Sequence, residues 1–141
     1  MTLKLAELKD RYANLDWALS SGVIHGDAAV GNALRDWNGQ PVMIDLDNFA
    51  IDHREWDLIL TAVYYDSFGW HTKADYEAFA QNYGFDIMKW SGYPTMKELS
   101  EFLMVTWVIT KSGESQHVAD EASKRIEALH TGASRKNWDP L

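Results

Sequence analysis

The sequence predicts a mainly α-helical domain with one short β-hairpin, and two observations support this fold class. Apolar residues recur at helical spacing near the N-terminus and again through most of the chain after residue 55. Between these two parts, Asn38-Gly39 is a strong signal for a hairpin turn, and the segments on either side of it have the apolar character of strands. We therefore expect one hairpin over about residues 33–44 and no larger sheet.

The length of 141 residues favours a single domain, 1–141. The first helix is expected over residues 3–20, where leucines and a tyrosine follow the helical period. Val23 and Ile24 are expected to form a short buried strand or turn entry before a loop. The tail that follows the last helix is polar apart from Trp138 and is expected to lie along the surface. The later helices are expected at residues 56–68, 73–83, 96–110 and 114–129.

The composition limits the classes of partner. The formal net charge is −8 and the pI is about 4.9, which argues against the basic face that nucleic-acid phosphates require. The sequence contains no cysteine, which excludes disulfides, thiolate metal sites and a cysteine nucleophile. It also contains no apolar run of membrane-spanning length and no apolar signal core at its N-terminus. We therefore expect a cytoplasmic protein that binds neither nucleic acid nor membrane.

The residues best suited to chemistry lie in the loop after the first short strand and directly after the hairpin. His25-Gly26-Asp27 opens the loop, Asn32 follows five residues after Asp27, and Asp45 follows the second strand of the hairpin. In phosphoryl transfer the protein mainly positions the reactants, neutralises charge and supplies one base. A carboxylate such as Asp27 can take the proton of an acceptor hydroxyl. The side-chain oxygens of Asn32 and Asp45 are hard ligands of the kind that Mg²⁺ prefers.

This pattern is completed by Ile-Asp-Leu-Asp at residues 44–47 and by Arg-Glu-Trp-Asp-Leu at residues 54–58, and it resembles the aminoglycoside phosphotransferase family. That family is related to choline kinases and, more distantly, to protein kinases. The resemblance runs from about residue 3 to the Trp-Asp-Pro-Leu tail. It implies the C-terminal lobe of a protein-kinase-like fold. It also implies a kinase that transfers the γ-phosphate of ATP or GTP to a hydroxyl of a small molecule, with Mg²⁺ as cofactor.

The resemblance also implies a role for each site residue. Asp27 corresponds to the catalytic base, and Asn32 and Asp45 correspond to ligands of the metal that accompanies the nucleotide. Asp57 corresponds to an aspartate that braces the catalytic loop from the start of a helix. His25 corresponds to a packed, hydrogen-bonded scaffold residue and not to a proton carrier. Asp47 is ambiguous, because it either provides a second metal contact or caps the turn that follows.

One departure from the family pattern affects the expected activity. In this family an N-terminal lobe supplies the loop that covers the phosphates and a lysine that contacts them, whereas only 24 residues precede His25 in this sequence. We therefore expect a C-terminal lobe without its N-terminal lobe, as a fragment or a natural remnant, that is inactive alone. The apolar surface that the absent lobe would cover is expected to cause self-association. The alternative is a non-catalytic binding or interaction module derived from such a kinase.

Two further points stay open at this level. Residues 44–47 also resemble the aspartate motif of phosphohydrolases, but Phe49 stands where those enzymes have Thr or Val. The aromatic residues divide into two expected groups, the first in the core and the second lining an acceptor pocket. The first group is Trp56, Tyr64, Phe102 and Trp107, and the second is Tyr65, Trp70, Trp90 and Tyr93.

Overall fold

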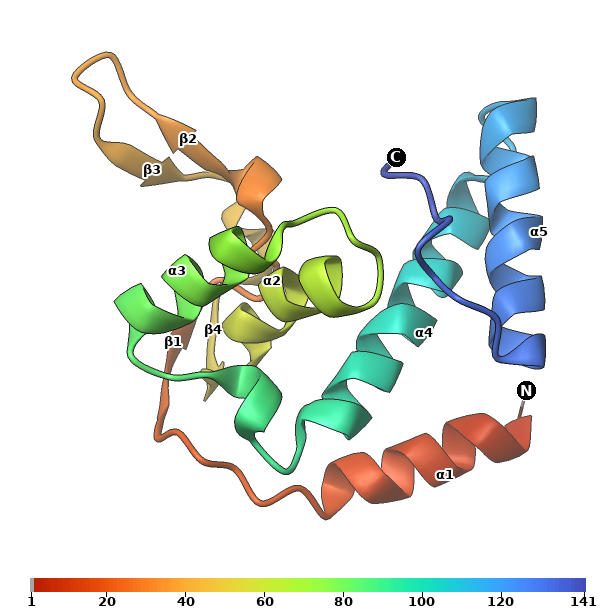
Figure 1. The fold of residues 1–141 in the computed structure, drawn as a ribbon, viewed down its shortest axis with the longest axis horizontal. Helices are drawn as coiled ribbons and strands as arrows, with labels where there is room; N and C mark the ends of the chain where they lie inside the picture. The colour runs from red at the N-terminus through yellow and green to blue at the C-terminus, as the bar shows by residue number, and fades with distance from the viewer. Residues whose placement is uncertain (1) are drawn as a thin grey trace.

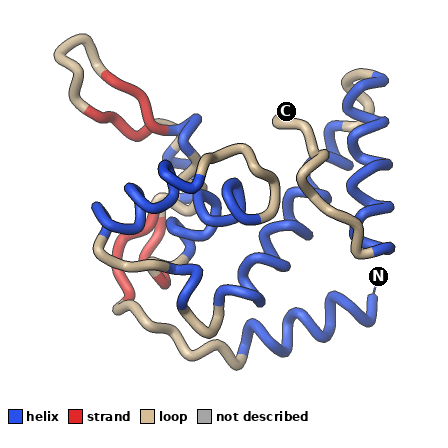
Figure 2. The backbone as a smooth tube through the Cα atoms, viewed as in Figure 1, coloured by secondary structure: helices blue, strands red, loops and turns tan. Residues whose placement is uncertain are grey.

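The computed structural model describes residues 2–141, and within them the chain is mainly helical, as the sequence predicts (Figures 1 and 2). The strands are short and occupy the first half of the chain, whereas the second half is helical. The elements in chain order are α1 (Thr2–Ala13), β1 (Ser21–Ile24), η1 (Val30–Asn32), β2 (Ala33–Arg35), β3 (Pro41–Met43), η2 (Leu46–Asn48), β4 (Ala50–His53), α2 (Trp56–Asp66), α3 (Lys73–Tyr83), η3 (Ile87–Lys89), α4 (Tyr93–Lys111) and α5 (Gln116–Thr131), where η denotes a short 3₁₀ helix.

The strands form two small antiparallel sheets. The predicted hairpin is confirmed, because β2 pairs with β3 and places Ala33 opposite Met43. The expectation of a single hairpin is wrong, because β1 also pairs with β4 and places Val23 opposite Ile51. The expected strand at Val23 and Ile24 forms, but only Ile24 is buried, whereas Val23 is 56% exposed. The four residues of β4 are too few to show a strand pattern, and their partner lies beyond the whole hairpin in sequence. Pairing between distant segments, and not local propensity, makes this segment a strand.

The observed helix bounds show which helix ends could be predicted from local sequence signals. α3 has the predicted bounds, because Thr72 and Asp75 form a reciprocal capping box and Gly84, at φ 86°, ends the helix in the left-handed conformation. α1 stops at Ala13, well before the expected end at residue 20. The later helices are shifted from the predicted bounds by two or three residues: α2 ends at Asp66, α4 begins at Tyr93, and α5 begins after Ser115 and ends before Gly132.

The core lies between α2 and α4. Ala62, Val63 and Met96 are fully buried there. Trp138 is only 2% exposed and stacks on Phe68 with 5.1 Å between ring centroids, so the tail is anchored at this residue and does not merely lie along the surface. Three of the predictions for aromatic residues are wrong. The sequence analysis placed Trp90 and Tyr93 in an acceptor pocket and Trp107 in the core. Trp90 and Tyr93 are buried in the core, whereas Trp107 is 49% exposed.

Figure 1 shows the arrangement that positions the site. The β2–β3 hairpin projects from the body, and α1 runs beside α4 at the opposite side. The C-terminal tail returns from the end of α5 toward the loop that joins α2 to α3. Trp70 in that loop donates a hydrogen bond from Nε1 to the carbonyl oxygen of Trp138, at 2.9 Å. None of the helices in residues 2–141 is both long and apolar enough to span a membrane.

Candidate active site

The loop that contains Asp27 is attached to the first turn of α2 by Asp57. Oδ2 of Asp57 accepts a hydrogen bond from the backbone N–H of His25 at 2.7 Å, and Oδ1 accepts one from the N–H of Gly26 at 2.9 Å. A carboxylate in the first turn of a helix is also favoured by the helix dipole. Asp57 therefore holds the start of the loop in a fixed position relative to α2.

The loop brings Asp27 and Asn32 into contact. Nδ2 of Asn32 donates to the carbonyl oxygen of Asp27 at 2.9 Å and lies 3.3 Å from Oδ2 of the same residue. The 3₁₀ turn η1 supports this geometry, since the N–H of Asn32 donates to the carbonyl oxygen of Ala29 at 2.9 Å. Both side chains are partly exposed, so the Asp27 carboxylate is open to a small molecule.

The segment before Asp45 is joined to the same loop from two sides. Nε2 of His25 lies 2.7 Å from the carbonyl oxygen of Ile44, and the N–H of Ile44 donates to the carbonyl oxygen of Asn32 at 2.9 Å. The N–H of Asp27 donates to Nδ1 of His25 at 3.2 Å, which assigns the proton of the ring to Nε2. His25 is buried and uses both ring nitrogens within the fold, so its contacts are those of a scaffold residue.

Asp45 and Asp47 follow in an exposed turn. Asp45 has φ 60° and ψ 64°, a left-handed conformation that residues other than glycine adopt at a cost. Asp47 lies in the first turn of η2, and its side chain is exposed. Both alternatives for Asp47, a metal contact or a turn cap, therefore stay open.

The side-chain oxygens of Asn32, Asp45 and Asp47 are of the chemical type that binds a magnesium ion. Asn32 directs its amide nitrogen to Asp27, which leaves Oδ1 as a possible ligand, while Asp45 and Asp47 present exposed carboxylates. Such oxygens are the ligands that Mg²⁺ prefers. Among residues 2–141 no three His, Cys, Asp or Glu side chains gather into a metal site. A Mg²⁺ ion held by two or three protein oxygens would keep waters or phosphate oxygens as its other ligands.

Glu55 is a second anchoring carboxylate, which the sequence analysis missed. It is completely buried, and its Oε1 accepts hydrogen bonds from the N–H groups of Ala18 and Leu19, each at 2.8 Å. These bonds replace helical ones and explain why α1 does not continue to residue 20. Glu55 thus attaches the segment before β1 to the start of α2, and Asp57 attaches the segment directly after β1. No local pattern distinguishes a buried glutamate of this kind from an exposed one.

Tyr64 on α2 is partly buried and packs against the core, as its spacing in the sequence predicts. Its ring packs edge-on against Trp70, 4.9 Å away, and beside His71, 5.5 Å away. Burial raises the pKa of the Tyr64 phenol, the negative charge of Asp27 raises it further, and Arg125 opposes this effect. The described residues offer its hydroxyl no hydrogen-bond partner.

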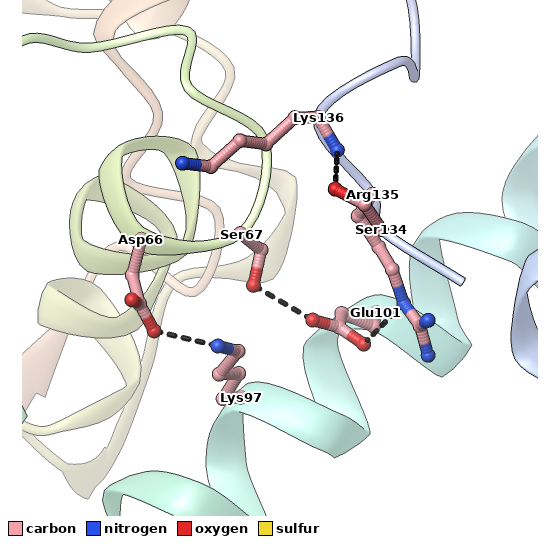
Figure 3. Close-up of a pocket in the computed structure, with 7 residues that line it drawn as sticks. All are labelled: Asp66, Ser67, Lys97, Glu101, Ser134, Arg135 and Lys136. Atoms are coloured by element: carbon pink, nitrogen blue, oxygen red, sulfur yellow. Dashed lines mark hydrogen bonds and ion pairs between the residues drawn. The ribbon is translucent and has the colours of Figure 1, made fainter. Parts of the chain in front are cut away.

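A polar cavity of about 330 Å³ lies at the other end of α2 (Figure 3). The carboxylates in it are already paired: Asp66 with Lys97 at 2.6 Å, and Glu101 with both Ser67 and Arg135. These contacts tie α2 to α4 and to the tail. None of the predicted site residues lines this cavity, whose lining is Asp66, Ser67, Lys97, Glu101, Ser134, Arg135 and Lys136.

A comparison with known protein families agrees with the resemblance seen in the sequence. Residues 2–99 match the phosphotransferase enzyme family, and this stretch includes the loop, the segment around Asp45 and the whole of α2. Searches of curated proteins and of solved structures found no match. Because the family match covers more than half of the chain, the protein belongs to the phosphotransferase enzyme family, a family of kinase-like enzymes.

Proposed function

We propose that the chain is the C-terminal catalytic lobe of a small-molecule kinase that transfers the γ-phosphate of ATP or GTP to a hydroxyl group. One observation carries the proposal. The loop from His25 to Asn32 is held by Asp57, and it joins Asp27 and Asn32 to the segment that ends in Asp45. These hydrogen bonds support the proposal, because they connect the proposed base and the two proposed metal ligands, and phosphoryl transfer depends on positioning.

Each residue has one task in this mechanism. Asp27 accepts a hydrogen bond from the acceptor hydroxyl and takes its proton as the oxygen attacks the γ-phosphorus. The bond between the γ-phosphorus and the bridging oxygen of the nucleoside diphosphate then breaks. Asn32 and Asp45, with Asp47 as a second contact, would hold a Mg²⁺ ion, which would neutralise the charge of the phosphate oxygens. His25 and Asp57 keep the loop in place and do not contact the reactants.

The metal site is tested by adding Mn²⁺·ATP and Mn²⁺·GTP to the ¹⁵N-labelled chain. The paramagnetic ion should broaden the amide signals of Asn32 and Asp45 at the lowest concentrations, and Asp45→Ala should abolish this effect. Asp120→Asn, an exposed change on α5, is the control and should behave as the wild type. Broadening that is spread over the surface, or that persists in Asp45→Ala, would contradict the proposed site and favour the non-catalytic module.

Activity requires a separate test. In the resembled family an upstream lobe supplies part of the contacts to the phosphates, so we expect the 141-residue chain alone to transfer phosphate too slowly to measure. The same chain joined to such a lobe should transfer phosphate from Mg²⁺·ATP or Mg²⁺·GTP to a small alcohol. In that protein Asp27→Ala should lower the rate at least about a hundredfold, as the loss of a general base does. A rate within a few-fold of wild type would refute the assignment of the base.

A further inference from the structure

The polar cavity at the C-terminal end of α2 lies apart from the candidate active site. Asp66, which lines the cavity, follows Asp57 by nine residues on α2, so the two are about 13 Å apart along the helix axis. Three separate parts of the chain line the cavity: the end of α2, one side of α4 and residues 134–136 of the tail (Figure 3). Its volume of about 330 Å³ is at the lower end of the range for small-ligand sites and equals that of about ten water molecules.

Hydrogen bonds hold the walls of the cavity in place. Glu101 is only 6% exposed, and its two oxygens accept hydrogen bonds from Oγ of Ser67 at 2.7 Å and from Nε of Arg135 at 3.1 Å. Oδ2 of Asp66 accepts a hydrogen bond from the ammonium group of Lys97 at 2.6 Å. Each carboxylate of the lining is therefore paired with one cation. Because these pairs fix the walls before a ligand arrives, they reduce the entropy lost on binding.

Lys136 adds a positive charge to the cavity that no carboxylate balances. Its side chain extends from the tail toward the end of α2 (Figure 3), and its ammonium group forms no ion pair or hydrogen bond within residues 2–141. The other two cations of the lining are paired with its two carboxylates, so three positive and two negative groups leave a net charge of +1. The chain as a whole has a formal net charge of −8. A local excess of positive charge in a cavity favours an anionic ligand.

Two further polar groups of the lining are free to bind a ligand. The hydroxyl oxygen of Ser134 accepts a hydrogen bond from the N–H of Lys136 at 3.2 Å, which leaves the hydroxyl hydrogen free to donate. Oδ1 of Asp66 takes part in no hydrogen bond in the described part of the chain, so it is free to accept one. A single unbalanced positive charge beside two carboxylates suits an anion of charge −1 better than a phosphate dianion, which the carboxylates would repel.

We propose that this cavity binds a small hydroxycarboxylate. The carboxylate of the ligand accepts hydrogen bonds from the ammonium group of Lys136 and from the hydroxyl of Ser134, and the hydroxyl of the ligand donates to Oδ1 of Asp66. Because all seven lining residues are polar or charged, the ligand has no large apolar part. The site does not depend on the proposed function, since none of the proposed catalytic or metal-binding residues lines the cavity.

Titration of the ¹⁵N-labelled chain with sodium glycolate tests the proposal, with sodium chloride of equal ionic strength as the reference. Glycolate should shift the amide signals of Ser67 and of residues 134–136 saturably, whereas glycolamide, which has no charge, should not. Acetate lacks the hydroxyl group and should bind about three- to tenfold more weakly than glycolate, as expected for the loss of one hydrogen bond.

Three variants test the role of Lys136. Lys136→Met should weaken glycolate binding at least about tenfold, because it removes a hydrogen bond between charged groups. Lys136→Arg keeps the charge and should bind glycolate more tightly than Lys136→Met does. Lys9→Met, at an exposed position on α1, removes the same charge far from the cavity in sequence and should bind glycolate as the wild type does. Lys136 is exposed, so these variants should unfold at the same temperature as the wild type.

The outcomes that would overturn the proposal are distinct from one another. Equal shifts with chloride and glycolate, or shifts that persist in Lys136→Met, would show that the anion only screens the surface charge. Tighter binding of inorganic phosphate than of glycolate would contradict the assignment of a carboxylate. Equal affinities for acetate and glycolate would contradict the hydrogen bond to Asp66. None of these results affects the proposed function, because the Mn²⁺ test concerns the loop at the opposite end of α2.

Discussion

Gly26 and Asn48 approach so closely that no side chain fits between them. A Cβ atom on Gly26 would lie 2.5 Å from the carbonyl oxygen of Asn48 and 2.7 Å from its Cβ, and Gly26 also has φ 84°. The contact joins the loop that carries Asp27 to the turn that follows Asp45. The relative position of Asp27 and Asp45, the proposed base and metal ligand, therefore depends on the absence of a side chain at Gly26.

Gly26→Ala should destabilise the chain by about 2–4 kcal/mol, because a positive φ costs about 1–2 kcal/mol and the clash adds to it. Gly39→Ala is the matched control, since Gly39 has φ 77° and nothing lies within 4 Å of an added Cβ. It should cost only about 1–2 kcal/mol. Urea unfolding of the three proteins measures the difference, and equal losses for the two variants would show that the contact with Asn48 relaxes easily.

Glu55→Ala should cost about 2–4 kcal/mol, because it leaves the N–H groups of Ala18 and Leu19 without their acceptor. Glu55→Gln keeps a side-chain oxygen and should cost less. Amide hydrogen exchange should show faster exchange at Ala18 and Leu19 and along β1 in Glu55→Ala. Glu77→Ala, an exposed change on α3, serves as the control. Unchanged exchange along β1 in Glu55→Ala would mean that Glu55 does not hold this strand.

Asp27→Asn should lower the pKa of Tyr64. Burial and the Asp27 charge both raise this pKa, so removal of the charge leaves burial as the remaining cause. A folded pKa above the unfolded value of 10.0 stabilises the fold below that pH, and the contribution is lost as the pH rises through the folded pKa. The ¹³Cζ signal of Tyr64, followed from neutral to alkaline pH, measures the shift. An identical titration in both proteins would show that the charge of Asp27 does not raise the pKa of Tyr64.

Glu98 should make the docking of α1 sensitive to acid. Burial alone would raise the pKa of Glu98, but hydrogen bonds and charge interactions with Lys4 and Arg11 on α1 lower it below the usual value of 4.5. Its stabilising contribution is therefore present above about pH 4.5 and is lost as the pH falls through the folded pKa.

Glu98→Gln should remove about 0.5–1 kcal/mol at neutral pH and nothing at low pH. Unfolding followed by circular dichroism at both pH values measures this difference. Glu114→Gln, which affects an exposed pair with Lys111, is the control. A loss of stability that is the same at both pH values would show that packing, and not charge, explains the effect of the variant.

The strand region should drive self-association. Val23 and Ile51 are directly opposed on β1 and β4, and they are 56% and 71% exposed, so they form an apolar pair on one face. Ile51→Lys should therefore shift the chain toward the monomer in sedimentation experiments, whereas Leu103→Lys on α4 should not. A wild-type chain that is monomeric at high concentration would refute this prediction. The exposed large apolar residues of this region are Val23, Val30, Leu34, Trp37, Val42, Met43, Ile44, Leu46, Phe49 and Ile51.

The sequence predicted those features that depend on local signals. The hairpin followed from Asn38-Gly39, and the bounds of α3 followed from its cap and from Gly84. The pairing of β1 with β4 and the early end of α1 were not predictable, because they depend on contacts between residues far apart in sequence.

The same distinction applies to the candidate site. The pattern from His25 to Asp45 identified residues that the structure joins through a network of hydrogen bonds, although their roles stay predictions. Glu55 was missed because its importance depends on its burial and on its contacts with Ala18 and Leu19. Neither property is visible in a single sequence without its fold.

The left-handed backbone of Asp45 means that selection for stability alone would act against the Asp45 carboxylate. Within residues 2–141 Asp45 is the one residue other than glycine with a positive φ, and glycine at this position would relieve the strain. A screen that rewards thermal stability alone would therefore favour glycine here and discard the carboxylate at the same time. Directed evolution of this chain therefore needs a selection for function as well as for stability. The single substitution Asp45→Gly would stabilise the fold and would also remove the proposed metal ligand.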